Sequence, residues 1–562
     1  MNKLLINHLG YDCNAPKQII LQQTSPLFAE QEVLFELLNS ETLKCEFSGY
    51  IDYIGSVDNW SQGYFSVLDF SAFEQQGSYI MRVNCLAEVI ESETFVIKNS
   101  THFKQSFDLL LSYFSNQRCQ DMWDEKDRSI GFYGDKRKDN VDVHGGWYDA
   151  SGDKSKYLSH LSYANYMNPQ QTPMVVWNML ASFENPLLSA PQCEALKNEI
   201  LYGAEFLARM QDEQGYFYTT VFDQWSHDPE KRMICSYKTQ SGYLNSQWQA
   251  GWRMGGGMAI ASLARASLIP CELRELYLHK AEIGFWHLVE HNLSYLDDGI
   301  ENIIDDYCAL LAAIELYAAT KQSRYQKVAV ARVSSLIKRL TYDSQFYGWL
   351  SADHLGERPY FHAAEEGLPM IALLRFLSVM PVEDSLRDKI HSTLQQMARC
   401  YVKLAEEVNN PFSYPRMYKM TSTSPKASSF FYPHENESGY WWQGENARLA
   451  SLASAFKLLV KSGIVETTLQ HKLALIAQSS LDWILGKNPM DICMLNGLGY
   501  HNPPEFDPLH ESIKGGICNG ITSGLWDENS IAFSPTHDPN HAWRWSEQWI
   551  PHSAWFLLAI SC

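Results

Sequence analysis

The apolar residues of this chain change their spacing once, near residue 100, and this change constrains the fold more than any other feature. Before it, apolar and polar residues alternate in short runs separated by Gly, Pro, Asn and Asp, which predicts a small antiparallel β-sandwich. After it, apolar residues recur every three or four positions almost to the C-terminus, which predicts helices. The predicted strands are residues 4–7, 18–22, 33–38, 64–68, 78–83 and 93–97.

The helical spacing occurs in two kinds of segment. Some, such as 309–314, contain almost no polar residue and should be covered on most sides, whereas others are amphipathic. An inner ring of buried helices inside an outer ring of amphipathic ones explains both kinds. The predicted helices are 102–118, 174–184, 193–211, 249–267, 272–291, 302–320, 322–340, 362–379, 385–408, 444–462, 466–485 and 548–560.

The length of 562 residues exceeds one ordinary core. We therefore expect a mainly α protein with a structural β-domain over 1–98 and a helical domain over 99–562. Long irregular stretches interrupt the helices, and compact domains seldom keep such loops without a use, so we expect the functional site there. These stretches are 119–158, 213–248, 342–361, 409–443 and 487–547.

Charge and cysteine content narrow the classes of partner. Lys and Arg number 45 against 65 Asp and Glu, and a net charge of −20 argues against binding nucleic acid or anionic lipid. No apolar run approaches the roughly 18 to 20 residues that span a bilayer. The twelve cysteines are scattered without a CxxC pair, which indicates neither a zinc site nor a disulfide framework. With no export signal visible at the N-terminus, these features favour a cytoplasmic location.

The stretch 144–157 is the strongest candidate for chemistry. Asp149 and Asp153 stand four positions apart in a turn rich in small residues, and two neighbouring aspartates can hold and deprotonate a water. Trp147 and Tyr148 precede them and offer flat faces on which a sugar ring can rest. The alternative is that both aspartates are ordinary turn and cap residues.

A second candidate lies near the C-terminus, where Glu547 stands among Trp543, Trp545 and Trp549, at the predicted start of the last helix. A carboxyl set among such rings can have its pKa raised by desolvation, which suits a general acid. The alternative is a glutamate that simply favours a helix N-terminus.

Five motifs in order give the chain a family resemblance. They are Asn7-His8-Leu9-Gly10-Tyr11, Gly145-Gly146-Trp147-Tyr148-Asp149, Asp305-Asp306-Tyr307-Cys308-Ala309, Leu485-Gly486-Lys487-Asn488-Pro489 and Ser546-Glu547. Together they resemble glycoside hydrolase family 9, the family of many inverting cellulases. The resemblance covers nearly the whole chain. It implies an immunoglobulin-like β-sandwich followed by an (α/α)6 barrel, with no cofactor and no catalytic metal.

The resemblance also implies roles for the carboxylates. Asp153 corresponds to the general base, Asp149 to the residue that helps to hold the water, and Glu547 to the general acid. An inverting hydrolase needs acid and base on opposite sides of the sugar, roughly 6.5 to 9.5 Å apart, so that a water fits between them. The family's usual Asp-Ala-Gly-Asp has one extra residue here, Ser151, so either aspartate remains a candidate base. Ser546 replaces the family's Asn before the glutamate.

Within the family, the chain looks most like cytoplasmic exo-β-D-glucosaminidases, which release glucosamine from the non-reducing end of short β-1,4 chains. Where many family cellulases carry a sugar-binding Arg, this chain has Glu511 next to His510, and a glutamate there can pair with an ammonium group. The alternative is a solvated loop glutamate. Further predicted substrate contacts are Tyr440, Trp441 and Glu445 along the cleft wall, with core packing as the alternative, and His501.

Three other interpretations stay open at this stage. The same mechanism can serve cello-oligosaccharides, in an endoglucanase or an exo-glucosidase, and the fold can also belong to a catalytically silent sugar-binding protein. A metal site of His537, Asp538 and His541 is a minor alternative, because inversion needs no metal and Pro539 is typical of an ordinary loop. We expect a small oligosaccharide as the partner, while the sequence leaves the oligomeric state undefined.

Overall fold

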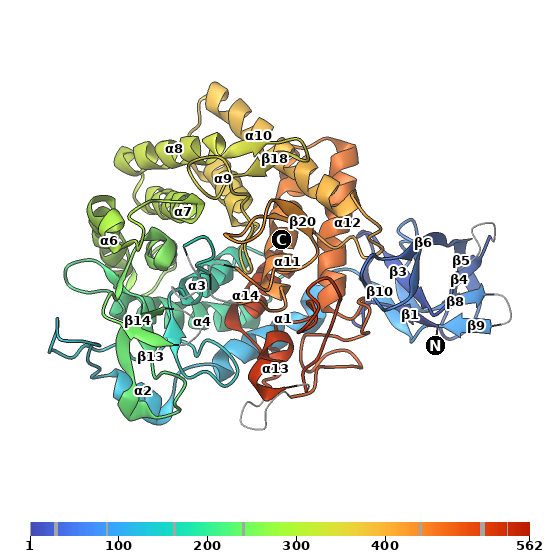
Figure 1. The fold of residues 1–562 in the computed structure, drawn as a ribbon, viewed down its shortest axis with the longest axis horizontal. Helices are drawn as coiled ribbons and strands as arrows, with labels where there is room; N and C mark the ends of the chain where they lie inside the picture. The colour runs from blue at the N-terminus through green and yellow to red at the C-terminus, as the bar shows by residue number, and fades with distance from the viewer. Residues whose placement is uncertain are drawn as a thin grey trace.

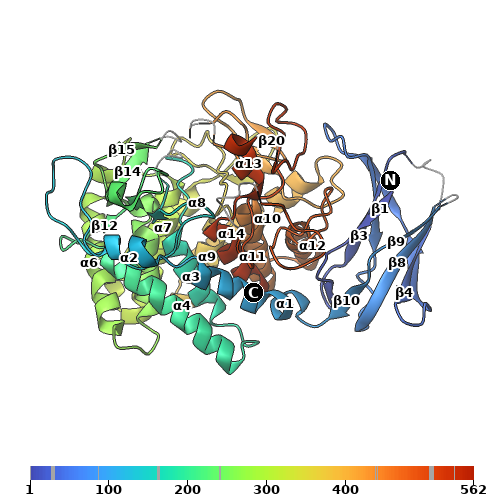
Figure 2. The same cartoon turned by 90° about the horizontal axis from the view of Figure 1, so that it is seen from below.

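A small β-domain lies beside a larger helical domain in the computed structural model (Figures 1 and 2). The last strand of the β-domain, β10 (Phe95–Lys98), is followed directly by the first helix, α1 (Thr101–Asn116). No helix in the described ranges is both long and apolar enough to cross a membrane. The structure describes residues 2–26, 32–85, 88–160, 165–238, 242–436, 438, 441–505, 512–536 and 538–562.

The β-domain is a sandwich of two sheets around an apolar core. One sheet has the strand order β1-β3-β7-β6, and the other has the order β2-β10-β8-β4-β5, with β9 also paired to β8. Alternate side chains, such as Phe35, Leu37, Met81 and Val83, point into the core. The strands are β1 (Lys3–Leu5), β2 (Tyr11–Asp12), β3 (Gln18–Gln23), β4 (Leu34–Asn39), β5 (Cys45–Tyr50), β6 (Asp52–Ser56), β7 (Tyr64–Asp69), β8 (Gly77–Cys85), β9 (Glu88–Glu91) and β10.

All six predicted strands are present, with ends shifted by one or two residues. The prediction missed β2, β5, β6 and β9. No residue of β5 or β6 is fully buried, so their sequences lack the alternation that burial of one face imposes. The other two are only two and four residues long.

Two of the family motifs hold the domains together. The Nδ2 of Asn7 donates to Asp482 Oδ1 over 2.8 Å, and both side chains are buried. His8 lies against Gly486, whose φ is +122° and where a Cβ would come within 2.2 Å of the imidazole. Only glycine fits there, so the first and the fourth motif pack against each other at the junction between the domains.

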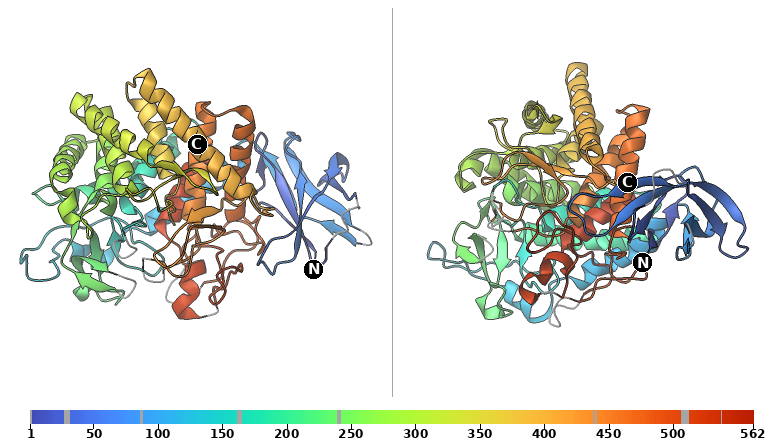
Figure 3. Two further views of the ribbon diagram at one scale, coloured as in Figure 1. Left: turned by 45° about the horizontal axis from the view of Figure 1, so that its top comes forward. Right: turned by 45° about the vertical axis from the view of Figure 1, so that its right-hand side comes forward.

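Twelve helices form two concentric rings in the described part of the chain. Consecutive members of the inner ring contact each other, and α14 closes the ring by contacting α3. Each outer helix packs against the inner ring, and the layers are visible in the views of Figure 3. The inner helices are α3 (Thr172–Ser182), α5 (Gly256–Ala266), α7 (Ile303–Thr320), α9 (Leu368–Val379), α11 (Asn446–Ser462) and α14 (Ile550–Ser561). The outer helices are α1, α4 (Ala190–Arg209), α6 (Arg274–Tyr295), α8 (Ser323–Lys338), α10 (Asp384–Glu406) and α12 (Thr467–Ile484). The prediction of an (α/α)6 barrel after a β-sandwich is therefore confirmed.

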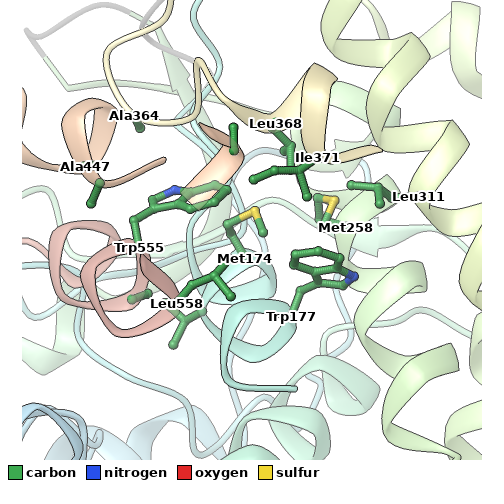
Figure 4. Packing of buried hydrophobic residues seen from close by; sticks show 14 of the residues in the cluster. Met174, Trp177, Met258, Leu311, Ala364, Leu368, Ile371, Ala447, Trp555 and Leu558 are labelled. Atoms are coloured by element: carbon green, nitrogen blue, oxygen red, sulfur yellow. The ribbon is translucent and has the colours of Figure 1, made fainter. Parts of the chain in front are cut away.

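The interior of the ring is filled by side chains. Figure 4 shows Met174 and Trp177 of α3, Met258 of α5 and Trp555 of α14 converging on one core. Because the inner helices are covered on nearly all sides, their sequences are mainly apolar, as in α5 and α14, where residues Gly256–Ala266 and Ile550–Ile560 are all buried. The ring is therefore a packed scaffold, and any site must lie on its ends.

Each predicted helix has an observed counterpart. The largest shifts are at α5 and α9, where the residues before the helix form other structure: Gly255 takes a left-handed φ of +96°, which ends the short 3-10 turn Trp252–Met254. Two further helices, α2 (Asp121–Asp127) and α13 (Pro539–Ser546), lie in stretches predicted to be irregular. Glu547 follows α13, and α14 begins at Ile550, two residues later than the predicted start of the last helix, so Glu547 lies in the turn before that helix.

All inner helices begin on the same face of the ring. Short connections lead from α3, α5, α7, α9 and α11 to the next outer helix, and the segments that return from the outer helices to the inner ones are long except between α6 and α7. Those long segments contain short strands: β11 (Lys156–Tyr157), β12 (Phe217–Tyr218), β13 (Thr220–Phe222), β14 (Met233–Lys238), β15 (Tyr243–Asn245), β16 (Gln249–Ala250), β17 (Leu340–Tyr342), β18 (Tyr347–Leu350), β19 (Met417–Lys419) and β20 (Ala427–Ser429). Along the upper edge of Figure 2, β14, β15, β20 and α13 mark this face.

Candidate active site

Two segments almost four hundred positions apart pair side by side on this face. Ala150 and Trp549 form an antiparallel bridge. The Ser151 N–H donates to Gln548 O over 2.8 Å, and the Gln548 N–H donates back to Ser151 Oγ over 2.9 Å. Continuing this register places Glu547 opposite Gly152, one residue from Asp153. The extra residue between the two aspartates, Ser151, is thus the one that joins the two halves of the site.

Asp149 is held by donors from three directions. Its Oδ1 accepts a hydrogen bond from Gln171 Nε2, at the start of α3, and its Oδ2 accepts one from Trp549 Nε1 over 3.0 Å, at the start of α14. His160 Nε2 lies 3.1 Å from the same Oδ2. Asp149 is 3% exposed. Its orientation is therefore fixed by neighbours on two inner helices and on the loop after β11.

Asp153 is held from its own side of the turn. The Ser155 N–H donates to Oδ1 over 2.8 Å, and the Tyr157 hydroxyl donates to Oδ2 over 2.9 Å. Asp153 is 9% exposed, three times as much as Asp149. An ionised carboxylate offers about four lone-pair positions, so Asp153 keeps more free capacity to accept a proton from a water.

Glu547 sits in the turn between α13 and α14, and Asn519 fixes it there. The Asn519 N–H donates to Glu547 O over 2.8 Å, and the Asn519 side-chain amide, which donates to Trp543 O over 2.7 Å, favours the ionised form of the Glu547 carboxyl. Asn519 is itself held by His552, whose Nε2 lies 2.7 Å from Asn519 Oδ1. The carboxyl side chain therefore faces one fixed donor from the described residues.

The three carboxyls influence each other electrostatically. Burial raises the pKa of Glu547 well above its ordinary value, and the charges of Asp153 and Asp149 raise it further, while Asn519 acts in the opposite direction. Burial and the charge of Asp153 also raise the pKa of Asp149, against which the donors Trp549 and Gln171 favour the carboxylate. Asp149 thus has more donors that favour its ionised form than Glu547 has.

The comparison with known proteins shows the family of the chain. The model of glycosyl hydrolase family 9 matches residues 103–523, and that of the cellulase N-terminal ig-like domain matches residues 1–87. The chain belongs to glycosyl hydrolase family 9. A cellodextrinase of Butyrivibrio fibrisolvens is 23% identical to this family 9 chain over 94% of this chain and 92% of the relative. A xyloglucan-specific endo-β-1,4-glucanase of Bacteroides ovatus is 20% identical over 96% of this chain and 88% of the relative.

Solved family 9 structures share the fold along the whole chain. A metagenome-derived family 9 endoglucanase superimposes with a TM-score of 0.69 at 16% identity and covers 100% of this chain and 98% of its own. A thermostable endoglucanase from Alicyclobacillus acidocaldarius gives a TM-score of 0.66 at 18% identity, covering 100% and 99%. This chain is thus a family 9 glycoside hydrolase with its N-terminal immunoglobulin-like domain.

Among the aromatic residues predicted to stack on sugar, three are buried in this family 9 chain. Trp147 is fully buried, donates from Nε1 to Glu199 over 2.7 Å, and packs so tightly on Gly203 that a Cβ there would come within 2.3 Å of the indole. Lys154 Nζ lies 4.6 Å from the ring centroid of Tyr148. Trp441 packs with Trp442 and Trp545. None of the three rings presents an open face, because each fills the protein behind the site.

Glu445 lies beneath the predicted cleft wall. Its Oε2 accepts from Arg448 Nη1 over 2.9 Å and from the Tyr414 hydroxyl over 3.1 Å, and its Oε1 accepts from the Tyr432 N–H over 2.8 Å. Burial raises the pKa of Glu445 to about 7, while Arg448 lowers it. The side chain is 1% exposed, so its contacts are internal.

Of the remaining predicted contacts, the structure describes only His501, and it does not bring this residue to the carboxyls. His501 is exposed and lies at the domain junction, with its Nδ1 3.1 Å from Asp491 O and its ring beside Tyr500 and His8. Tyr440, His510 and Glu511 lie outside the described residues, as does His537 of the alternative metal set. Asp538 caps α13 by accepting from the Asn540 N–H over 2.9 Å.

Sequence reasoning missed the neighbours of the three carboxyls: Tyr157, His160 and Gln171 beside the aspartates, Asn519 beside Glu547, and the hydrogen bond from Trp549. Tyr157 had a local signal, because it follows Asp153 by four residues in the same stretch. His160 and Gln171 follow Asp149 by 11 and 22 residues, whereas Trp549 is 400 residues away and reaches Asp149 only because the ring of helices closes.

Proposed function

We propose that this chain hydrolyses β-1,4-glycosidic bonds of short oligosaccharides with inversion of the anomeric configuration. The observation that carries the proposal is the meeting of Asp149 and Asp153 with Glu547, through the paired segments 149–151 and 548–550. An inverting hydrolase requires a carboxylate that accepts a proton from water on one side of the bond and a protonated acid on the other.

In this proposal Asp153 is the general base. Both aspartates hold the attacking water, but Asp149 already accepts from Gln171 and Trp549 and lies next to His160, whereas Asp153 accepts from two donors and is the more exposed. A proton of the water therefore passes to Asp153 while the oxygen of the water bonds to the anomeric carbon. The wider spacing of the pair is compatible with these roles, because the added Ser151 is used to pair with Gln548.

Glu547 is the general acid. It donates its proton to the glycosidic oxygen as the bond to the anomeric carbon breaks, and its raised pKa keeps it protonated near neutral pH. Products leave with Asp153 protonated and Glu547 ionised, and exchange with solvent restores both. Retention of all three carboxyls with this geometry argues against a silent sugar-binding protein.

For the substrate, we propose glucosamine oligomers, cleaved from the non-reducing end, with cello-oligosaccharides as the alternative. The chain's net charge of −20 favours a cationic substrate by long-range attraction. The cello-oligosaccharide alternative is supported by the relative described as a cellodextrinase. The predicted ammonium partner, Glu511, lies outside the described residues, so the assignment rests on the sequence there.

One experiment separates these substrates. Initial rates on a 4-nitrophenyl β-glucosaminide and on the matching β-glucoside are compared for the wild-type chain and for Glu547→Gln. We expect faster turnover of the glucosaminide; equal rates or preference for the glucoside would refute the amino-sugar assignment. A third outcome is that neither aryl glycoside is hydrolysed but a sugar is still released from trimers. If Glu547→Gln then released this sugar as fast as the wild type, the proposed role of the carboxyls would be contradicted. Fractionation of cells with an antibody against the chain tests the accompanying proposal of a cytoplasmic location.

A further inference from the structure

We infer that His160 is a positioning residue for the hydrolytic water, set in one tautomer by Tyr237. The inference rests on the proposed function and gives a role to two residues, His160 and Tyr237, that lie outside the five sequence motifs. In this arrangement the neutral imidazole of His160 donates from Nε2 to Asp149 and thereby fixes the orientation of that carboxylate. Asp153 is then left free to take the proton.

Tyr237, His160, Asp149, Tyr157 and Asp153 form a continuous network of buried side chains. His160 Nε2 lies 3.1 Å from Asp149 Oδ2, and its Nδ1 is hydrogen-bonded to the Tyr237 hydroxyl. The imidazole stacks on Tyr157, with ring centroids 4.1 Å apart and planes inclined by 25°. Tyr157 in turn donates to Asp153. One stacked pair of rings therefore holds both aspartates, the imidazole through Asp149 and the phenol through Asp153.

The chemistry of the partners selects the tautomer. Gln171 Nε2 and Trp549 Nε1 both donate to Asp149 and favour its ionised form against the effect of burial. An ionised carboxylate only accepts hydrogen bonds, so with Asp149 ionised the proton of the imidazole lies on Nε2 of His160. Nδ1 is then an acceptor, and the Tyr237 hydroxyl supplies its proton. The imidazole stays neutral because burial lowers the pKa of His160 to about 3. His160 keeps its Nε2 proton throughout the reaction, and the proton of the water goes to Asp153.

This network of side chains is also supported from outside the ring of helices. Tyr237 lies on β14 and stacks on Phe222 of β13, with ring centroids 4.6 Å apart. The other two donors to Asp149, Gln171 and Trp549, stand at the starts of α3 and α14. Asp149 is thus fixed from the sheet and from two inner helices at once, which leaves little freedom for its plane to rotate.

Removal of one hydroxyl tests the inference. Tyr237→Phe keeps the stacking on Phe222 but releases Nδ1 of His160. The matched control is Tyr218→Phe, which also deletes a buried hydroxyl, bonded over 2.8 Å to Asp212 and without contact to the carboxyls in the described structure. We expect Tyr237→Phe to lower kcat on a glucosamine or glucose trimer by about 10- to 100-fold with KM within about twofold. Tyr218→Phe should leave kcat unchanged. Equal kcat in the two variants would overturn the inference.

A spectroscopic measurement keeps the test independent of activity and of substrate. The ¹⁵N chemical shifts of the ring nitrogens of His160 identify which nitrogen carries the proton in the full-length wild-type chain. We expect protonated Nε2 and unprotonated Nδ1, and a mixture of tautomers in Tyr237→Phe with unchanged circular dichroism. Protonated Nδ1 in the wild type would overturn the inference even in an active enzyme. Loss of hydrolysis in the wild type with the expected tautomer would instead contradict the proposed function alone.

A pair of substitutions at His160 gives a further readout. His160→Gln retains a donor of similar reach, whereas His160→Met retains volume without a donor. We expect His160→Gln to keep at least about tenfold more of kcat than His160→Met. Equal loss in both variants, with both folded, would show that His160 only fills space.

Discussion

The two sides of the candidate active site differ in how many hydrogen-bond donors face their carboxyls. Asp149 accepts from Gln171 and Trp549 and has His160 beside it, while Glu547 is met by Asn519. Both sides are shielded from water, and burial raises the pKa of Asp149 and of Glu547 alike. The difference in donors, and not in burial, therefore decides which side holds the proton and acts as the acid.

Substitution of the acid side should have the largest effect. Glu547→Gln keeps the size of the side chain but removes the transferable proton, so we expect kcat on an oligosaccharide to fall about 10⁴-fold. The loss should be much smaller on a dinitrophenyl glycoside, whose leaving group needs no proton. Steady-state kinetics on both substrates measure this difference.

The matched control for this variant is Glu365→Gln. Glu365 is also buried with its pKa raised by burial to about 8, and it accepts from the Tyr307 hydroxyl over 2.6 Å. We expect its kcat to stay within about threefold of the wild type. A similar loss for both glutamates, or for both leaving groups, would remove Glu547 from the acid role.

The two aspartates of the base side should lose different amounts. Asp153→Asn removes the group that accepts the proton, and we expect kcat to fall about 10³-fold regardless of the leaving group. Asp149→Asn keeps the base but presents an amide to the surrounding donors, and we expect a loss of about 10²-fold. The same pair of substrates measures both variants. A larger loss in Asp149→Asn would exchange the roles of the two residues.

Removal of one donor from the base side should have a smaller effect. Tyr157→Phe deletes the hydroxyl that donates to Asp153 Oδ2 but keeps the stacking on His160. Because the Ser155 N–H still holds the other oxygen, we expect kcat to fall about threefold to tenfold with unchanged KM. A wild-type kcat in this variant would show that Ser155 alone orients the base.

The smallest expected effect concerns stability. A carboxyl whose pKa is raised by folding binds more protons in the folded than in the unfolded state above its ordinary pKa of 4.5, so stability falls as pH rises through the raised value. Glu547→Gln removes this loss. We expect its melting temperature to exceed the wild-type value by about 1 to 2 °C at pH 8 and by less at pH 5. Calorimetry at both pH values measures this, and a difference that shrinks as pH rises would contradict it.

The scaffold could be predicted from sequence because its signals are local. The inner helices α7 and α14 are mainly apolar since most of their residues are buried, and this shows directly in their composition. Even the ends of most helices follow from the apolar spacing. Strands β5 and β6 escaped prediction because neither has a fully buried residue to give the pattern.

The site could be predicted only in part, for a physical reason. Asp149 and Asp153 share one turn, and Glu547 stands in a distinctive aromatic context, so their residue types and motifs were readable. The burial of a side chain was not readable in this way. Trp147 is of a residue type that can bind a sugar ring, but the absence of a Cβ at Gly203 lets its indole pack against α4. His160 and Gln171 reach Asp149 through the folding of the irregular segment between α2 and α3, and Trp549 reaches it only after the ring closes, so no local residue spacing indicates these hydrogen bonds.

The central claim is that the acid and the base act from opposite sides of the bond with one water between them. Proton NMR of the first sugar released from a β-1,4-linked trimer, recorded before mutarotation equilibrates the anomers, tests this most directly. The account predicts the α-anomer as the initial product. Initial appearance of the β-anomer would contradict it, because retention requires a covalent intermediate on one of the carboxylates.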